Sequence, residues 1–100
     1  MARTAFIVIR SPQELNPADA IRRFAGKEDA FVVLFEDAVY NAVRAENAKL
    51  LSDVAADVSV ARDDLEARGF GESDLKVGRA ADYDDIIDTI MDRTERTVTI

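Results

Sequence analysis

Two runs of consecutive apolar, largely β-branched residues lie in the first third of the chain, at residues 4–9 and 30–35. Consecutive rather than alternating apolar positions indicate strands that are covered on both faces, which is typical of central parallel strands flanked by helices. Pro12 follows the first run and cannot donate a ladder hydrogen bond, so the first strand should end before it. The pair Glu36-Asp37 closes the second run.

The residues between these two runs have the signals of one helix. Asn16 is a favourable N-cap, Pro17 suits the first helical turn, and Gly26 suits the end of a helix. The chain is therefore predicted to start with a strand-helix-strand unit. The predicted helix has an apolar face that comprises Ala20, Ile21 and Phe24.

Helical periodicity returns after the second strand. The apolar positions within residues 39–43 and 50–54 fit a helix, but the polar residues 44–47 interrupt the pattern. This favours two short helices or one bent helix. Residues 63–69 predict a further brief helix, because acidic residues stand at its start and Gly69 stands at its end.

The clearest helix of the chain is predicted near the C-terminus. Its apolar positions recur at spacings of three and four residues, and aspartates occupy the opposite face. Asp82 precedes the helix as its expected N-cap. We expect the apolar face to pack on a sheet as core, with no cofactor needed to explain it. The apolar positions are Tyr83, Ile86, Ile87, Ile90 and Met91.

Three shorter segments complete the predicted sheet, at residues 57–61, 75–77 and 97–100. Alternating strands and helices predict an α/β fold, as a single domain over residues 1–100 with three α/β/α layers and about five mostly parallel strands. The pattern leaves the strand order open. Ligands and partners of such sheets usually meet the carboxyl ends of the strands. Those ends carry Arg10-Ser11-Pro12, Glu36-Asp37, Arg62-Asp63 and Gly78-Arg79.

Composition narrows the chemistry that these residues can perform. The 100 residues contain no Cys and no His, which excludes a thiolate nucleophile, a persulfide carrier, a disulfide, an Fe–S cluster and a Ser-His-Asp triad. The Ser, Lys, Tyr and carboxylate residues that remain occur in numbers that surface solvation explains. We therefore expect a protein that is not an enzyme and that holds no cofactor or metal.

The net charge of the chain limits the classes of partner that it can bind. The chain has 20 acidic and 13 basic residues, a formal net charge of −7, and this charge repels phosphate backbones and anionic lipid. Direct binding of nucleic acid or of a membrane is disfavoured. No apolar run reaches the roughly 18 residues of a membrane span, and residues 1–10 lack the pattern of a signal peptide. The expected location is the cytoplasm.

Three stretches of the sequence, taken in their order and spacing, resemble one protein family. They are Ile9-Arg10-Ser11-Pro12, residues 33–40 (Val-Leu-Phe-Glu-Asp-Ala-Val-Tyr) and residues 64–70 (Asp-Leu-Glu-Ala-Arg-Gly-Phe). The tail that begins at Tyr83-Asp84-Asp85-Ile86-Ile87 and ends in a short strand is similar as well. Together these motifs resemble the DsrH/TusB branch of the DsrE/DsrF/DsrH-like sulfur-relay proteins, over nearly the whole chain.

This resemblance implies a DsrE/F/H-like fold and a subunit of an assembly that passes persulfide sulfur, in some organisms toward 2-thiolation of tRNA wobble uridine. It also implies DsrE-like (TusD-like) and DsrF-like (TusC-like) partners, or self-association into a homo-oligomer. Some family members have a cysteine in the first helix, where this chain has Ile21 with Ala20 beside it. An alkyl side chain cannot hold a persulfide, so the carrier cysteine would belong to another subunit.

The carboxyl ends of the first two predicted strands, with the helix that follows, supply the candidate residues that face a partner or ligand. Glu36 and Asp37 either stabilise a helix N-terminus or line a partner-facing edge. Arg10 either pairs with Glu36 or binds an anion near the active loop of a partner. Tyr40 either contributes to an interface or packs under a loop. The candidates are Arg10, Ser11, Glu36, Asp37 and Tyr40.

Other functions fit the sequence less well. The acidic residues around the last predicted helix lack the glycine and terminal glutamate of a calcium loop, so a solvated face is favoured over a metal site. Gly69 and Gly71 lack the further residues of a phosphate loop. A phosphoryl-accepting receiver domain needs an acidic pair where this chain has Arg10-Ser11. The remaining alternative is a homo-oligomeric protein of the DsrE-like fold that binds another small molecule or protein partner outside sulfur metabolism.

Overall fold

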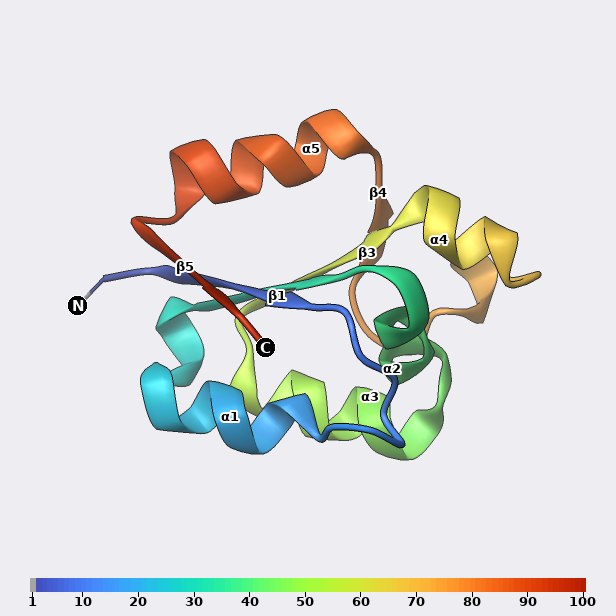
Figure 1. The fold of residues 1–100 in the computed structure, drawn as a ribbon, viewed down its shortest axis with the longest axis horizontal. Helices are drawn as coiled ribbons and strands as arrows, with labels where there is room; N and C mark the ends of the chain where they lie inside the picture. The colour runs from blue at the N-terminus through green and yellow to red at the C-terminus, as the bar shows by residue number, and fades with distance from the viewer. Residues whose placement is uncertain (1) are drawn as a thin grey trace.

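The strands of the protein form one parallel sheet. In the computed structural model, which describes residues 2–100, the strand order is β4-β3-β2-β1-β5, and every neighbouring pair runs parallel (Figure 1). The fold class and the number of strands predicted from the sequence are therefore confirmed. The strands are β1 (Thr4–Val8), β2 (Ala30–Leu34), β3 (Asp57–Ala61), β4 (Arg79–Ala81) and β5 (Arg96–Thr99).

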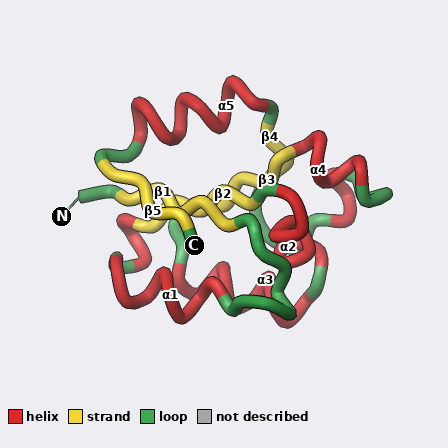
Figure 2. The backbone as a smooth tube through the Cα atoms, viewed as in Figure 1, coloured by secondary structure: helices red, strands yellow, loops and turns green. Residues whose placement is uncertain are grey.

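Helices cover the two faces of this sheet unequally. Figures 1 and 2 show α1, α2 and α3 on one side and α5 alone across the other, while α4 lies beside the end of β3. A π-helical turn at Thr89–Arg93 continues α5 toward β5. The helices are α1 (Pro17–Phe24), α2 (Tyr40–Val43), α3 (Ala45–Val54), α4 (Arg62–Ala67) and α5 (Tyr83–Asp88).

The larger core lies between the sheet and α1 to α3, and the smaller one lies under α5. Alternate side chains of each strand point to opposite faces, so the consecutive apolar residues of β1 and β2 serve both cores. The smaller core contains Val33, Ala61, Ala81 and Ile86. The larger core includes Phe6, Val8, Ile21, Val32, Leu34, Leu51, Val58 and Val60.

Several local signals in the sequence are confirmed. The side chain of Asn16 accepts a hydrogen bond from the backbone N–H of Ala18 at 3.2 Å and so caps α1. Arg44 has an extended backbone and separates α2 from α3, which makes two short helices. Gly69 follows α4 with a φ of +83°, a conformation that ends a helix and favours glycine.

The prediction of a fourth strand at residues 75–77 is wrong, because the strand is β4 at Arg79–Ala81. Leu75 and Val77 are apolar because they pack, partly buried, against the larger core. Between them the N–H of Lys76 donates to the carbonyl of Ala42 at 2.8 Å rather than to a strand. The chain reaches β3 only after Gly78.

The prediction that α5 presents one buried apolar face is wrong for three of its five residues. Ile86 is buried and Ile90 is half-buried, but Tyr83, Ile87 and Met91 are 70%, 37% and 71% exposed. Residues spaced by four lie on one side of a helix, and a narrow sheet face contacts only the Ile86 side. Phe24, which was placed on the apolar face of α1, is 52% exposed.

Gly78 is expected to be the glycine least tolerant of substitution. Its φ is +72°, and a Cβ built there would clash with the carbonyl oxygen of Val58 and lie 2.9 Å from the Val58 Cβ. We expect Gly78→Ala to lower the free energy of unfolding by about 2 to 4 kcal/mol, as strain and overpacking add. Gly69→Ala is the matched control, since its φ is also positive but no atom lies within 4 Å, and it should cost about 1 kcal/mol. Urea unfolding of both variants tests this, and equal losses would contradict it.

Candidate functional site

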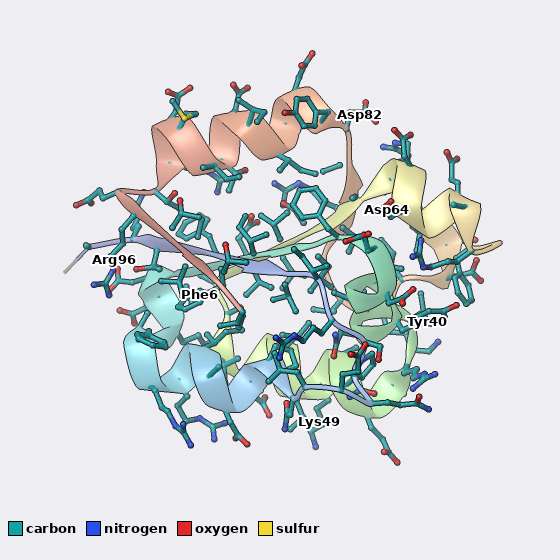
Figure 3. All side chains as sticks on the ribbon, viewed as in Figure 1. Phe6, Tyr40, Lys49, Asp64, Asp82 and Arg96 are labelled. Carbon is teal, nitrogen blue, oxygen red and sulfur yellow. The ribbon has the colours of Figure 1, made fainter. Side chains whose placement is uncertain are left out.

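The loops that follow β2, β3 and β4 meet at the carboxyl end of the sheet. Figure 3 shows Asp64, Asp82 and Tyr40 toward this end of the molecule and Arg96 at the opposite end. Both Asp64 and Asp82 belong to segments that directly follow strands, at the start of α4 and just before α5. Charged side chains from separate parts of the sequence therefore gather where α/β sheets usually bind ligands or partners.

Glu36 has a backbone conformation that is unusual for any residue other than glycine. Its φ is +50°, and it is the one such residue outside the glycines within residues 2–100. The left-handed region costs an L-residue about 1 to 2 kcal/mol. The backbone N–H of Glu36 donates to Oδ2 of Asp64 at 2.7 Å. Asp64, in the first turn of α4, therefore holds the turn after β2 in its strained form.

A second contact joins the same two segments. The Nε and Nη2 atoms of Arg68 donate to Oδ1 of Asp37 at 3.0 and 2.8 Å, and its Nη1 atom donates to the carbonyl of Asp64 at 3.0 Å. The hydrogen bond with Asp37 raises the pKa of Arg68 above its ordinary value. The guanidinium of Arg68 is charged at any ordinary pH, and its hydrogen bonds join the Glu36–Val39 turn to α4.

A third contact joins α4 to the start of α5. The Nε atom of Arg62 donates to Oδ1 of Asp82 at 2.8 Å, and its Nη2 atom donates to the carbonyl of Ala80 at 3.3 Å. The hydrogen bond with Asp82 raises the pKa of Arg62. Asp82 stands at the predicted N-cap position of α5, but its side chain makes no capping hydrogen bond; instead it pairs with Arg62.

The first and the third of these contacts border a cleft of about 250 Å³, because Asp64, Arg62 and Asp82 belong to its lining. Apolar side chains from the strand ends and α5 form part of its lining, and the charged side chains of α4 and Asp82 form the rest. The charged groups of the cleft are carboxylates and one guanidinium, which is already paired with Asp82. The cleft can therefore match a partner in shape and charge, but it contains no thiol or imidazole. The cleft is lined by Phe35, Ala61, Arg62, Asp63, Asp64, Ala81, Asp82, Tyr83 and Ile86.

One of the two roles predicted for Arg10, pairing with Glu36, is wrong. No ion pair joins them within 4 Å, and Arg10 lines a different depression, next to Thr99 and Ile100 of the β5 end. Ser11 makes local contacts instead, since its hydroxyl donates to Oε1 of Glu14 at 3.4 Å. The structure therefore separates Arg10 and Ser11 from the cluster around Glu36.

The remaining candidates take part in packing. The ring of Tyr40 is half-buried and meets the ring of Phe70 edge-on, with centroids 5.8 Å apart, while the guanidinium of Arg44 lies 5.4 Å from the Tyr40 centroid. Neither Glu36 nor Asp37 caps the helical turn that they begin. Their neighbours Asp64 and Arg68 were missed by the sequence reasoning, although the spacing of four places both on one side of α4.

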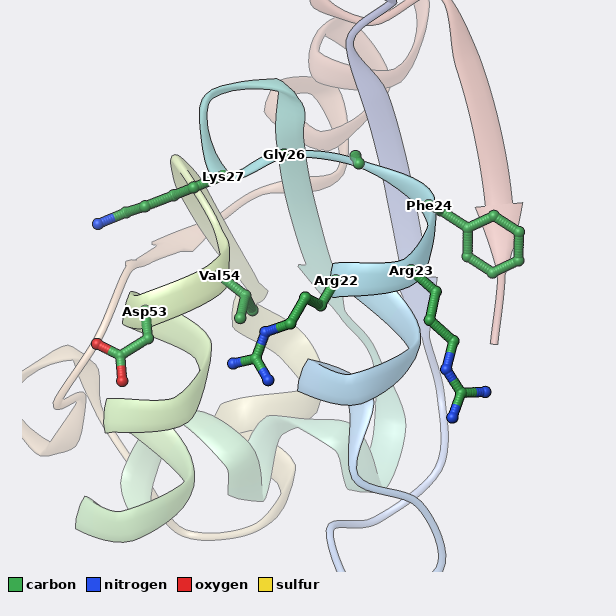
Figure 4. Close-up of a pocket in the computed structure, with 8 residues that line it drawn as sticks. Arg22, Arg23, Phe24, Gly26, Lys27, Asp53 and Val54 are labelled. Atoms are coloured by element: carbon green, nitrogen blue, oxygen red, sulfur yellow. The ribbon is translucent and has the colours of Figure 1, made fainter.

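The amino end of the sheet has a cavity of about 370 Å³ near the C-terminal ends of α1 and α3. Arg22, Arg23 and Lys27 line it on an otherwise acidic chain. Figure 4 shows these three side chains pointing in different directions. Cations that diverge do not form a binding site for one anion, so the carboxyl end remains the candidate site.

Comparison with known proteins agrees with the motifs found in the sequence. The model of the family described as DsrH-like protein matches residues 10–95. The chain belongs to the DsrH-like family. A comparison with curated proteins finds no significant match. The predicted family resemblance is thereby confirmed, and the family supports a role related to sulfur relay for this DsrH-like chain.

Two further findings concern the part of the DsrH-like chain that the structure describes. Within residues 2–100, no helix has both the length and the apolarity needed to cross a membrane. Within the same residues, no group of three or more His, Cys, Asp or Glu side chains is arranged to hold a metal ion. The aspartates around α5 are exposed, as expected for a solvated face.

Ile21, at which the resemblance implied a cysteine in some family members, is fully buried in the larger core of this DsrH-like chain. A thiol on this side of α1 would be closed to a partner. Ala20 beside it is half-buried. Ile21 therefore lies in the larger core and not in the cleft at the carboxyl end.

Relief of the strained backbone at Glu36 should be measurable. We expect Glu36→Gly to leave the free energy of unfolding unchanged or to raise it by up to about 1 kcal/mol, because glycine adopts a positive φ without strain. Glu28→Gly is the control, since Glu28 is also exposed but does not have a positive φ, and it should lose about 0.5 to 1 kcal/mol. If both variants lose the same stability in urea unfolding, the turn is not strained.

The burial of Ile21 predicts the reactivity of a thiol placed there. Ile21→Cys should react with an aromatic disulfide reagent at least about a hundredfold more slowly than the exposed control Asp19→Cys, because reaction requires opening of the core. In denaturant the two thiols should react at the same rate. Fast reaction of Ile21→Cys in a chain that retains its native circular dichroism would show that α1 exposes this position.

Proposed function

We propose that this DsrH-like chain is a non-catalytic subunit of a sulfur-relay assembly that transfers persulfide sulfur toward 2-thiolation of tRNA wobble uridine. The observation on which the proposal depends is the family match over residues 10–95 in a chain that has no cysteine. A persulfide requires a thiol. In this proposal DsrE-like and DsrF-like subunits supply the reactive cysteine, and this chain supplies surface that positions it.

The charged cleft at the carboxyl end supports this role. Its segments are fixed to one another by Asp64, Arg68 and Arg62 rather than left as separate loops. A fixed surface loses less conformational freedom when a partner binds. We propose that partner subunits contact this end of the sheet, where the candidates Glu36, Asp37 and Tyr40 follow β2 and the candidates Arg10 and Ser11 follow β1.

The proposal also implies where the assembly acts and which subunits contact the tRNA. The assembly would act in the cytoplasm, where tRNA is modified. The net charge of −7 opposes direct contact of this chain with the tRNA backbone. The partner subunits would therefore make the nucleic-acid contacts of the relay.

The absence of cysteine also favours a second candidate function, namely a homo-oligomer outside sulfur metabolism that binds another small molecule or protein. The two functions differ in their partners. Light scattering that shows a single homo-oligomer, unchanged when DsrE-like and DsrF-like subunits are added, would favour the second function.

Affinity purification from the native host tests the first function. We expect a tagged copy of the chain to recover DsrE-like or DsrF-like subunits, and deletion of its gene to lower the 2-thiouridine content of tRNA, measured by mass spectrometry of nucleosides. Expression of the wild-type chain from a plasmid should restore the thiolation and serves as the control. Recovery of no relay subunit, together with unchanged thiolation after deletion, would overturn the proposal.

A further inference from the structure

The outer side of α5 has an apolar stripe that no described part of the chain covers. Tyr83, Ile87 and Met91 lie one helical turn apart, and together they are the most continuous group of exposed large apolar side chains within residues 2–100. We call these three residues the α5 stripe. The other large apolar residues that are exposed, Ile9, Phe24 and Leu50, lie on separate elements. Contiguous apolar side chains at a surface mark interaction sites, whereas single ones do not.

The neighbours of the α5 stripe are acidic. Asp84, Asp85, Asp88 and Asp92 are all exposed on the same helix and its π-helical continuation. A second copy of the chain that packed its own α5 stripe symmetrically against this one would place aspartates opposite aspartates. Like charges at an interface cost affinity. The charge therefore favours a different protein whose contact surface is basic.

The α5 stripe is continuous with the candidate site. Tyr83 is both its first residue and part of the lining of the 250 Å³ cleft, to which the buried Ile86 also belongs. Asp82, immediately before the stripe, is held by Arg62 at 2.8 Å. A protein that lies along α5 consequently reaches the cleft without crossing another element.

We propose that the α5 stripe is the docking surface for a different subunit of the relay, one that presents an apolar groove bordered by Arg or Lys side chains. The apolar groove would remove the three exposed side chains from water, and its basic border would pair with the aspartates of α5. This docking places a segment of the partner at the cleft. The identity of the partner as a relay subunit rests on the proposed function.

Binding of co-expressed DsrE-like and DsrF-like subunits from the same organism tests the docking surface. The test variant combines Tyr83→Ala, Ile87→Ala and Met91→Ala. Tyr83 and Met91 are mostly exposed and Ile87 is 37% exposed, so circular dichroism should stay close to wild type and urea unfolding should show only a modest loss, from Ile87→Ala. The matched control combines Phe24→Ala and Leu50→Ala, which are exposed apolar residues on α1 and α3. We expect the test variant to bind at least about tenfold more weakly in calorimetry, and the control to bind as the wild type does.

The acidic border is tested separately. Asp84→Asn with Asp88→Asn should weaken binding and flatten its dependence on KCl concentration, since fewer ion pairs remain to be screened. Asp19→Asn with Asp53→Asn, which removes two exposed charges from α1 and α3, is the control and should leave both quantities unchanged.

The outcomes separate the docking surface from the function. If the wild-type chain binds a relay subunit and the α5 stripe variant binds it equally well, the proposed docking surface is wrong and the relay function is unaffected. Failure of the wild-type chain to bind either subunit would overturn the relay function, and the docking surface with it. Self-association of the purified chain that the stripe variant abolishes would make a second copy the occupant and overturn the proposed partner.

Discussion

A parallel sheet is stable only when both of its faces are covered, and this constraint organises the whole chain. Three helices cover one face of the sheet, and α5 alone covers the other. The first face buries large side chains such as Phe6, Ile21 and Leu51 completely, each worth about 1.5 to 3 kcal/mol. The second face has a much smaller apolar core, so α5 must be held partly by other contacts.

Those contacts are electrostatic and lie around Arg93, the last residue of the π-helical turn that continues α5. Asp57 on β3 receives a hydrogen bond from Arg79 at 2.7 Å and lies 3.8 Å from Arg93. The guanidinium of Arg93 also lies 5.0 Å from the centroid of the Phe31 ring. Arg93 ends the π-helical turn, in which the hydroxyl of Thr94 donates to the carbonyl of Ile90 at 2.9 Å. Such partly exposed contacts contribute only about 0 to 1 kcal/mol each, so they add to the packing of Ile86 and Ile90 in the smaller core and do not replace it. The outer apolar residues of α5 stay exposed because they face away from the sheet.

The sequence predicts well those features that depend on neighbours in the chain. Consecutive apolar residues locate β1 and β2, Asn16 locates the start of α1, and the polar residues 44–47 locate the break between α2 and α3. Features that depend on distant residues were predicted less well. One example is the start of β4, which follows the close contact between the backbones of Gly78 and Val58. The two residues are 20 positions apart, so the local sequence pattern gives no sign of this contact.

The candidate site likewise has some features that the local sequence predicts and others that depend on distant residues. The strand ends that form it could be named from the sequence, because parallel strands place their carboxyl ends together. Which side chains meet there could not be named, because the positive φ of Glu36 redirects the chain after β2 and the pairing of β1 with β5 leaves Arg10 beside the end of β5. The apolar period of α5 was also correct as a helix signal. It did not show that the sheet face below was too narrow to cover all five residues.

The shape of the carboxyl end finally depends on one buried side chain. Exposed ion pairs such as Asp37–Arg68 contribute only about 0 to 1 kcal/mol each, which is less than the roughly 1 to 2 kcal/mol of strain at Glu36, so they cannot by themselves hold this turn. Their partner residues are fixed because α4 is fixed, and α4, which has six residues, is anchored in the larger core by the buried Leu65. Asp64 and Arg68 flank Leu65 in sequence, and this places one acceptor and one donor where the turn at Glu36 needs them. The core therefore positions α4, and α4 positions both the turn after β2 and, through Arg62, Asp63 and Asp64, one side of the cleft.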